Sequence, residues 1–322
     1  MEGLRAYDIA KHFLVKQDSK KRKLHALDGL SINLEMGKTI GLAGESGCGK
    51  TTLGKILVGL YKPDAGEIII DGEKFSELKR RNMREIRKKI QMVFQDPYSS
   101  LNPRWNVTSI IREPLVNYRI GTKKEQINRV LHLLRTVGLS ETFSKLYPHQ
   151  MSCGQRQRIA IARSLALDAK YLICDEVVSA LDVSVQAQIL NLLREIQKKL
   201  DISILFISHD LAVLRHISDE IAIMYLGKIV EKAKANILFS KPLHPYTVGL
   251  LESILTPDPD RERNLERPGL EGDVPSPINI PNGCRFNRRC KHATEICRLE
   301  EPELLEIEGQ HYVACHLFAS NR

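Results

Sequence analysis

The segment 44–51, with the sequence GESGCGKT, is the feature that most constrains this chain. It follows a short apolar run at 39–43 and precedes a run of helical character at 52–60. A glycine-rich loop between a strand and a helix lets backbone N–H groups and the positive end of the helix surround phosphate groups. The lysine of such a loop reaches the β- and γ-phosphates, and the next residue ligates Mg²⁺. The loop therefore predicts a nucleoside triphosphate as the ligand.

Short β-branched runs alternate with amphipathic helices along most of the chain. Strands are expected at 67–71, 90–94, 171–174 and 203–207. This alternation predicts an α/β fold with a parallel, doubly wound sheet covered by helices. After the second of these strands, apolar residues recur at helical spacing until Gly138 stops the run. The pattern predicts a helical subdomain, at about 96–168, inserted into the sheet domain.

The formal net charge of +9 is distributed unevenly. Residues 256–322 carry more acidic than basic side chains, so the positive excess belongs to residues 1–255. Its densest stretches, at 20–23 and 79–89, have no interleaved aromatic residues, which predicts solvated surface and no nucleic-acid interface. The sequence contains no run of eighteen apolar residues and begins without a signal-peptide core. It therefore predicts neither a membrane-spanning helix nor secretion.

The segment 171–176, YLICDE, is an apolar strand that ends in two carboxylates. In a doubly wound sheet, the ligand crevice lies at the carboxyl ends of the strands, so these carboxylates are expected beside the phosphate-binding loop. Asp175 is then placed to hold Mg²⁺, and Glu176 to polarise the attacking water.

Four further motifs accompany these two elements in a definite order. They are Gln95 in VFQDP, the segment 151–158 with the sequence MSCGQRQR, the segment 179–182 with the sequence SALD, and His209 in ISHD. Together the six motifs resemble those of the ABC-type ATPases, and the resemblance covers nearly the whole chain. It implies an ABC-type P-loop ATPase domain at 1–255, with the inserted helical subdomain and a small cysteine-rich extension at 256–322.

The resemblance also implies roles for single residues. Glu176 is the general base, Gln95 senses Mg²⁺ and the γ-phosphate, and His209 contacts the γ-phosphate. Lys50 completes the catalytic set, and Mg²⁺ is held by Thr51, Gln95 and Asp175. The residues implied to bind ATP within the chain are Phe13, Gly44, Ser46, Gly47, Cys48, Gly49, Lys50, Thr51 and Thr52. Phe13 is expected to stack on the adenine, and Tyr7 is the alternative.

The segment 151–158, called the signature segment below, also favours anion binding by its own chemistry. Ser152 and Gly154 precede a helix expected to begin near Gln155, so a hydroxyl group, free N–H groups and a helix dipole converge on an anion. In ABC ATPases this anion is the γ-phosphate held by the opposite subunit. The resemblance therefore implies a dimer in which Ser152, Gly154, Gln155 and Asp182 act in trans on ATP.

Two positions depart from the family pattern. Cys153 stands where the usual signature has glycine, which adds a side chain close to the phosphate and restricts the backbone. Val177 stands where proline usually follows the catalytic glutamate. We expect the composite ATP site completed by Cys153 to be weakened, while the site that holds Lys50 and Glu176 stays competent.

Finer motifs resemble one branch, the ATPases of oligopeptide and dipeptide importers. They lie at 94–104, 147–150 and 241–247, and Tyr98 and Ser99 favour the F-type subunit over the D-type. The resemblance implies a heterodimer with a D-type ATPase beneath two transmembrane permease subunits, which receive peptides from an extracytoplasmic binding protein. The chain would then be a peripheral protein on the cytoplasmic face of the plasma membrane, with no nucleic-acid partner.

The C-terminal part begins with a shift in composition. Six of the 14 prolines fall at 256–283, which predicts an extended, packed linker. A four-cysteine array follows, at Cys284, Cys290, Cys297 and Cys315. Four thiolates hold either Zn²⁺ or an iron–sulfur cluster, and the spacing lacks the short C-x2-C pairs typical of zinc. The resemblance favours a [4Fe–4S] cluster over zinc or unligated thiols.

Two other functional classes remain as alternatives. The positive charge is compatible with a soluble ABC ATPase that acts on nucleic acid or the ribosome, but the chain has neither a heptad arm nor a second ATPase domain. A regulator that uses ATP only as a clamp is the other alternative. Glu176 and His209 argue against it, whereas Cys153 is compatible with it.

Overall fold

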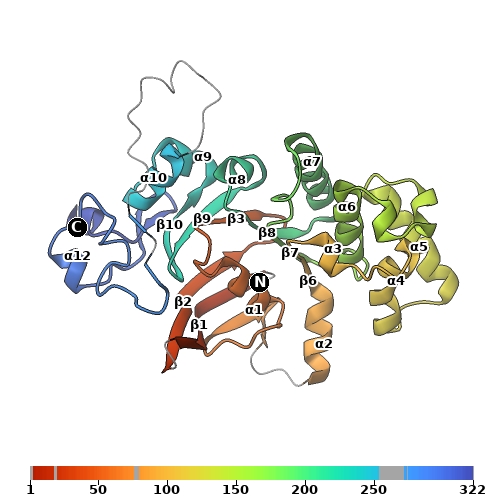
Figure 1. The fold of residues 1–322 in the computed structure, drawn as a ribbon, viewed down its shortest axis with the longest axis horizontal. Coiled ribbons are helices and arrows are strands. Elements are labelled where there is room, and N and C mark those ends of the chain that lie inside the picture. The colour runs from red at the N-terminus through yellow and green to blue at the C-terminus, as the bar shows by residue number, and fades with distance from the viewer. Residues whose placement is uncertain (1–2, 18–19, 76–79, 254–271, 274, 322) are drawn as a thin grey trace, which may run out of the picture.

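The computed structural model describes residues 3–17, 20–75, 80–253, 272–273 and 275–321. Figure 1 shows a large sheet crossing the molecule, with a smaller sheet beneath it and helices around both. The large sheet has the strand order β11-β12-β10-β9-β3-β8-β7-β6. Its strands are β3 (Thr39–Ala43), β6 (Ile90–Val93), β7 (Tyr171–Asp175), β8 (Ser203–Ile207), β9 (Glu220–Tyr225), β10 (Lys228–Lys234), β11 (Leu305–Glu308) and β12 (His311–Val313).

The centre of the large sheet is parallel, as the sequence predicts: β3 pairs in parallel with β8 and β9, and β7 pairs in parallel with β6 and β8. Alternate side chains of β8 enter different cores. Ile204 and Phe206 belong to one core, and Leu205 and Ile207 belong to the other. This alternation of buried residues is what a strand covered on both faces requires.

The two faces of the large sheet are covered differently. One face packs on helices, which include α7 (Val183–Leu200), α8 (Leu211–Ile217) and α9 (Ala235–Ser240). The other face packs on α1 (Lys50–Leu57) and on the smaller antiparallel sheet. The strands of that sheet are β1 (Leu4–Gln17), β2 (Lys20–Leu34), β4 (Ala65–Ile70) and β5 (Glu73–Lys74). On this second face, long antiparallel strands lie beside the helix α1.

The helical subdomain occupies the segment expected from the sequence and lies at the end of the sheet next to β6 (Figure 1). Its helices are α3 (Pro97–Ser100), α4 (Val107–Tyr118), α5 (Lys123–Thr136) and α6 (Cys153–Ser164), with short 3₁₀ turns at Glu141–Lys145 and Pro148–Gln150. Their apolar side chains share one core with the helical face of the large sheet. The helix α6, which carries the signature segment, is thus packed against the sheet that carries the phosphate loop.

The C-terminal strands extend the large sheet, which the sequence did not predict. β12 pairs antiparallel with β10, and Glu231 lies opposite Val313. The Glu231 side chain is fully buried, and His311 Nε2 lies 2.7 Å from its carboxylate. This region also contains α10 (Pro245–Glu252), α12 (Ile296–Leu299) and a 3₁₀ turn at His316–Asn321. Most of the predicted linker, 256–271 and residue 274, lies outside the described residues.

The two basic stretches differ in their surroundings. Residues 20–23, at the start of β2, are exposed as expected. In α2 (Arg80–Lys89), however, the Arg84 guanidinium lies 4.8 Å from the ring centroid of Tyr118, and Arg87 donates to the carbonyl of Gly59 at 2.8 Å.

Among the described helices, none is long and apolar enough to cross a membrane.

Candidate active site

The phosphate loop joins β3 to α1, and two of its glycines are required by close backbone contacts. Gly49 has a φ of 109°, and a Cβ atom there would lie 2.3 Å from the carbonyl oxygen of Ala26. A Cβ atom on Gly44 would lie 2.2 Å from the carbonyl oxygen of Met224. Any larger residue at either position would push the loop away from its neighbours.

The side chain of Lys50 is hydrogen-bonded to the backbone of the phosphate loop. Its side chain is buried, and its Nζ donates to the carbonyls of Gly44 at 2.6 Å and Glu45 at 3.1 Å. Cys48 is also buried, with its Sγ 3.8 Å from the same ammonium group, and burial raises the pKa of this thiol. The loop carbonyls thus compensate the charge of Lys50 and hold its ammonium group inside the loop.

Thr51 and Asp175 meet although 124 residues separate them. Thr51 Oγ1 donates to Asp175 Oδ1 at 3.1 Å, which brings two oxygen donors together at the start of α1. Burial, together with the neighbouring Glu176 carboxylate, raises the pKa of Asp175 above its ordinary value despite this hydrogen bond. Two hard oxygen donors beside the phosphate loop fit Mg²⁺, which is typically bound through few protein oxygens and the phosphates of its substrate.

Glu176 is the centre of a second group of side chains. Gln95 Nε2 donates to Glu176 Oε2 at 2.7 Å, and His209 Nδ1 lies 3.3 Å from Glu176 Oε1. Glu176 has a φ of 47°, in the left-handed region that non-glycine residues rarely adopt. Such backbone strain persists where surrounding structure enforces it and is frequent at functional sites. Here the Glu176 N–H donates to the carbonyl of Ile207 at 3.0 Å, which ties the turn to the end of β8.

A cavity of about 330 Å³ lies between these groups and the strands β1 and β2. Its lining residues are Phe13, Leu24, Ala26, Ser46, Gly47, Gly49, Lys50, Thr51, Thr52, Gln95 and Glu176. Phe13 therefore faces the cavity, whereas Tyr7 is 40% exposed and lies outside the lining. The sequence analysis missed Leu24 and Ala26. The apolar residues between Leu24 and Leu30 were the signal for their strand, but only its pairing with β1 places Leu24 opposite Phe13.

The signature residues lie outside the lining of this cavity. Ser152 caps α6: its Oγ accepts from the Gln155 N–H at 3.3 Å, and its own N–H donates to Gln155 Oε1 at 3.0 Å. Gly154 packs so closely on α7 that a Cβ atom would lie 2.4 Å from Val185 Cγ1. Asp182 caps α7 by accepting from the Val185 N–H at 2.9 Å.

The helix α6 begins two residues earlier than expected, at Cys153. Cys153 is its first residue, is half-exposed, and is absent from the described residues with positive φ. The backbone restriction expected from the loss of glycine therefore has no effect here, because cysteine readily adopts a right-handed helical conformation. The thiol itself is the remaining difference from a glycine.

The segment after Gln95 is tied to the signature helix. The Arg156 guanidinium of α6 lies 5.6 Å from the ring centroid of Tyr98, which is 55% exposed. Arg163, near the end of α6, donates to the carbonyl of Ser100 at 2.7 Å. These two contacts join the segment after Gln95 to α6.

The C-terminal region reaches back to the phosphate loop. Arg289 donates to both carboxylate oxygens of Glu45, at 2.8 and 3.0 Å, and only 5% of its side chain is exposed. The Glu45 N–H donates to the hydroxyl oxygen of Tyr246 at 2.9 Å. Glu45 follows Gly44 in the loop, so the loop is in contact with residues about 200 and 244 positions away.

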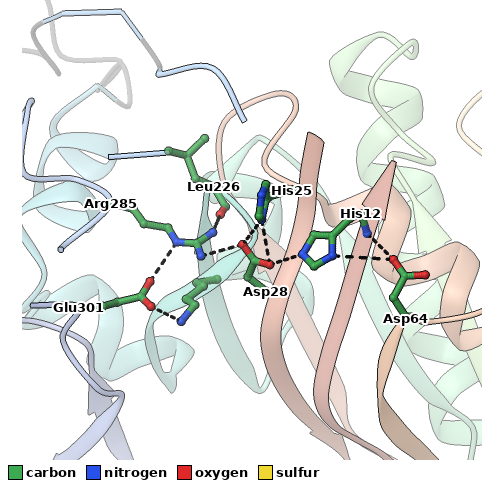
Figure 2. Close-up of polar contacts among 8 residues, drawn as sticks. His12, His25, Asp28, Asp64, Leu226, Arg285 and Glu301 are labelled. Atoms are coloured by element: carbon green, nitrogen blue, oxygen red, sulfur yellow. Dashed lines mark hydrogen bonds and ion pairs between the residues drawn. The ribbon is translucent and has the colours of Figure 1, made fainter. Parts of the chain in front are cut away.

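Arg285 makes a second link between the C-terminal region and the nucleotide-binding domain (Figure 2). Its Nη2 donates to Asp28 Oδ2 at 2.9 Å, and its Nε donates to Glu301 at 3.0 Å. Burial raises the pKa of Asp28, but hydrogen bonds from His12 and Arg285 outweigh this effect and leave the pKa below its ordinary value. Asp28 is therefore a carboxylate at neutral pH.

The four C-terminal cysteines lie near one another without forming a compact group. The pKa of Cys284 is raised to about 11, mainly because the thiol is buried. The other three thiols raise it further. Among the described residues, however, no three of the four sulfurs lie within 4.8 Å of one another. A single Zn²⁺ ion, bound at about 2.3 Å by each sulfur, would require closer sulfurs. The described residues thus contain no preformed metal site at these cysteines, and the [4Fe–4S] cluster stays a prediction.

Comparisons with known proteins agree with this geometry. A model of the ABC transporter family matches residues 27–179, and one of the oligopeptide/dipeptide transporter C-terminal region matches residues 230–297. The chain is 47% identical to the oligopeptide transport ATP-binding protein AppF of Bacillus subtilis, covering 97% of this chain and 96% of that protein. It is 48% identical to the dipeptide transport ATP-binding protein DppF of Haemophilus influenzae, covering 97% and 95%.

Solved structures of ATP-binding cassettes are similar as well. The dimeric post-hydrolysis structure of the cassette MJ0796 bound to ADP and Pi has a TM-score of 0.65 and 28% identity, covering 72% of this chain and 98% of that one. CbiO1 of Clostridium perfringens, part of the ABC transporter complex cbiONQ, has a TM-score of 0.64 and 28% identity, covering 74% and 90%. The ABC ATPase fold expected from the motifs is thereby confirmed.

Proposed function

Because the chain belongs to the family of ABC transporter ATP-binding proteins, we propose that it is the ATP-hydrolysing subunit of a membrane importer for oligopeptides or dipeptides. The family assignment makes it an ATPase. The peptide cargo is supported by the names of the two relatives, which match over nearly their whole length, and by the match to the transporter C-terminal region.

The observation that carries this proposal is the grouping of Gln95, Glu176 and His209 beside the cavity of the phosphate loop. ATP would occupy the cavity with its adenine against Phe13 and its phosphates in the loop. Thr51 and Asp175 would hold Mg²⁺, which neutralises phosphate charge when bound. Glu176 then accepts a proton from the attacking water, and His209 contacts the γ-phosphate. Gln95, bonded to Glu176, is placed to sense the γ-phosphate.

We further propose that hydrolysis requires a dimer. The signature residues Ser152, Gly154 and Gln155 lie outside the lining of this chain's own cavity, so a second ATPase subunit must supply their equivalents. The start of α6 supports this role, because the positive end of a helix attracts an anion. The similar cassette MJ0796 is dimeric in its post-hydrolysis structure. The partner that we propose here is a D-type ATPase subunit.

A groove between the sheet and the helical subdomain is where we propose that a permease subunit docks. It has a volume of about 330 Å³, and its lining includes Met92, Phe94, Pro114 and Leu167. Phe94 immediately precedes Gln95, so a permease helix in this groove would contact the segment that responds to ATP. Because a permease is a membrane protein, this docking would hold the chain on the cytoplasmic face of the membrane.

The four C-terminal cysteines are proposed to hold a [4Fe–4S] cluster, with zinc as the alternative. The other three thiols help to raise the pKa of Cys284, which places them near it, and four thiolates are the donor set of such a cluster. Basic residues surround the array at Arg285, Arg288, Arg289 and Lys291. Arg285 and Arg289, however, already pair with the carboxylates of Asp28, Glu301 and Glu45.

Cys153 is proposed to weaken the composite ATP site that it completes. Because its backbone is unstrained, the effect must come from the thiol side chain near the γ-phosphate of the partner's ATP. We expect Cys153→Gly to raise ATP turnover of the assembled complex and Cys153→Ala to raise it less, as measured by phosphate release. Equal turnover of wild type and both variants would rule out this effect.

Co-purification tests the proposed function. Tagged chain is recovered from gently solubilised membranes without oxygen, and its partners are identified by mass spectrometry. We expect two permease subunits and a second ATPase, and peptide uptake by the reconstituted complex should require ATP. Ribosomal or DNA-bound partners from the soluble fraction would overturn the importer and favour the nucleic-acid alternative.

A further inference from the structure

Two histidines and an aspartate meet on β1 and β2, next to the nucleotide cavity (Figure 2). His12 lies opposite His25 in the antiparallel pair, and their ring centroids are 4.5 Å apart. His12 Nε2 lies 2.5 Å from Asp28 Oδ1, and His25 Nδ1 lies 3.0 Å from Asp28 Oδ2. One nitrogen of each ring is therefore directed at the same carboxylate.

We propose that His12, His25 and Asp28 bind a divalent transition-metal ion of the Zn²⁺ type. The donor atoms all lie within 4.8 Å of one another, and among the described residues no other group of His, Cys, Asp or Glu is this close. An ion held at about 2.0–2.2 Å from each nitrogen or oxygen donor fits among them after small side-chain movements. Two imidazoles and one carboxylate suit transition metals, whereas Mg²⁺ and Ca²⁺ select oxygen ligands.

The neighbours of the three ligands hold them in a suitable orientation. Arg285 donates to Asp28 Oδ2 at 2.9 Å, which leaves Oδ1 for the ion. Arg285 also donates to Glu301, a carboxylate that it shares with Lys228. Asp64 Oδ2 lies 3.9 Å from the other ring nitrogen of His12 and accepts the His12 backbone N–H at 2.7 Å. Carboxylates beside the second nitrogen of a ligating histidine commonly orient the ring and raise its basicity.

The proposed site is open enough to exchange an ion with solvent. The exposed fractions of the side chains are 18% for His12, 29% for His25 and 17% for Asp28. Water would therefore complete the coordination. The ion would replace the hydrogen bonds that the two imidazoles now make with Asp28. An occupied site would join β1 to β2 through the ion, because His12 lies on β1 and both His25 and Asp28 lie on β2.

The test uses untagged full-length protein that has been treated with a chelator. We expect calorimetry to detect a Zn²⁺ site that His25→Asn weakens by about tenfold or more, because one of three ligands is lost. His132→Asn, which replaces an exposed histidine on α5, is the matched control and should bind Zn²⁺ like the wild type. Zn²⁺ should also raise the Tm of the wild type and of H132N more than that of H25N.

Co²⁺ distinguishes this site from the four C-terminal cysteines. At the proposed site it should give d–d absorption without the intense sulfur-to-metal band of thiolate ligation. A spectrum of the thiolate type alone, or equal Zn²⁺ affinity of H25N and wild type, would overturn the proposal. If circular dichroism shows that H25N does not fold, His12→Asn supplies the same comparison. None of these measurements depends on ATP turnover, so they test the metal site separately from the proposed function.

Discussion

Replacing Glu176 with glutamine is expected to reduce ATP turnover by roughly 10²–10⁴-fold, the range associated with loss of a general base. Glutamine preserves the shape of the side chain, and its carbonyl still accepts the hydrogen bond that Gln95 Nε2 donates at 2.7 Å. It cannot accept a proton from water. Nucleotide binding should therefore survive, and the complex should retain unhydrolysed ATP. Phosphate release measures the turnover, and filter binding of radiolabelled ATP measures the retention.

The matched control is Glu195→Gln. Glu195 is an exposed residue of α7 that lies outside the lining of the cavity, so the same chemical change there should leave turnover unaltered. The measurement requires the complex with its partner ATPase, because we propose that each ATP lies between two subunits. If E176Q hydrolyses ATP at nearly the rate of the wild type, hydrolysis occurs at the partner's site. This chain would then bind ATP without hydrolysing it.

Replacing Arg289 with glutamine is expected to weaken both the fold and ATP binding. Arg289 makes two hydrogen bonds to Glu45, and its side chain is 5% exposed. Removing one member of a buried ion pair costs roughly 3–5 kcal/mol. Because Glu45 itself is 22% exposed, we expect the free energy of unfolding to fall by an amount at the lower end of that range. Chemical denaturation followed by circular dichroism measures the loss.

The unpaired Glu45 carboxylate would also stand in the loop that must receive phosphates. Repulsion should weaken ATP binding by about tenfold, equivalent to about 1.4 kcal/mol. Adding Glu45→Gln removes the unpaired charge and should restore most of the affinity, which a purely structural defect would not do. Arg288→Gln is the matched control, because Arg288 is exposed. Unchanged ATP affinity in R289Q would show that the C-terminal region does not act on the loop.

The residues that sequence analysis placed best belong to short, contiguous motifs. Gly44, Lys50 and Thr51 lie in one loop whose spacing already implies its geometry, and Asp175 and Glu176 end one apolar strand. The structure brings Thr51 within 3.1 Å of Asp175 because parallel strands present their carboxyl ends at the same edge. The choice between Phe13 and Tyr7 was different. It depended on the register of β1 against β2, which the sequence pattern of either strand alone does not determine.

The amino-acid sequence is enough to predict the phosphate loop, because its glycines and Lys50 stand at spacings that the local backbone enforces. The distant residues that contact this loop and its neighbouring strands emerge only when the whole chain is folded. Arg289 reaches Glu45 across 244 positions, and β12 joins the edge of the large sheet at β10. His12, His25 and Asp28 likewise converge only through strand pairing. These contacts depend on how whole elements pack, and no local pattern of residues encodes that packing.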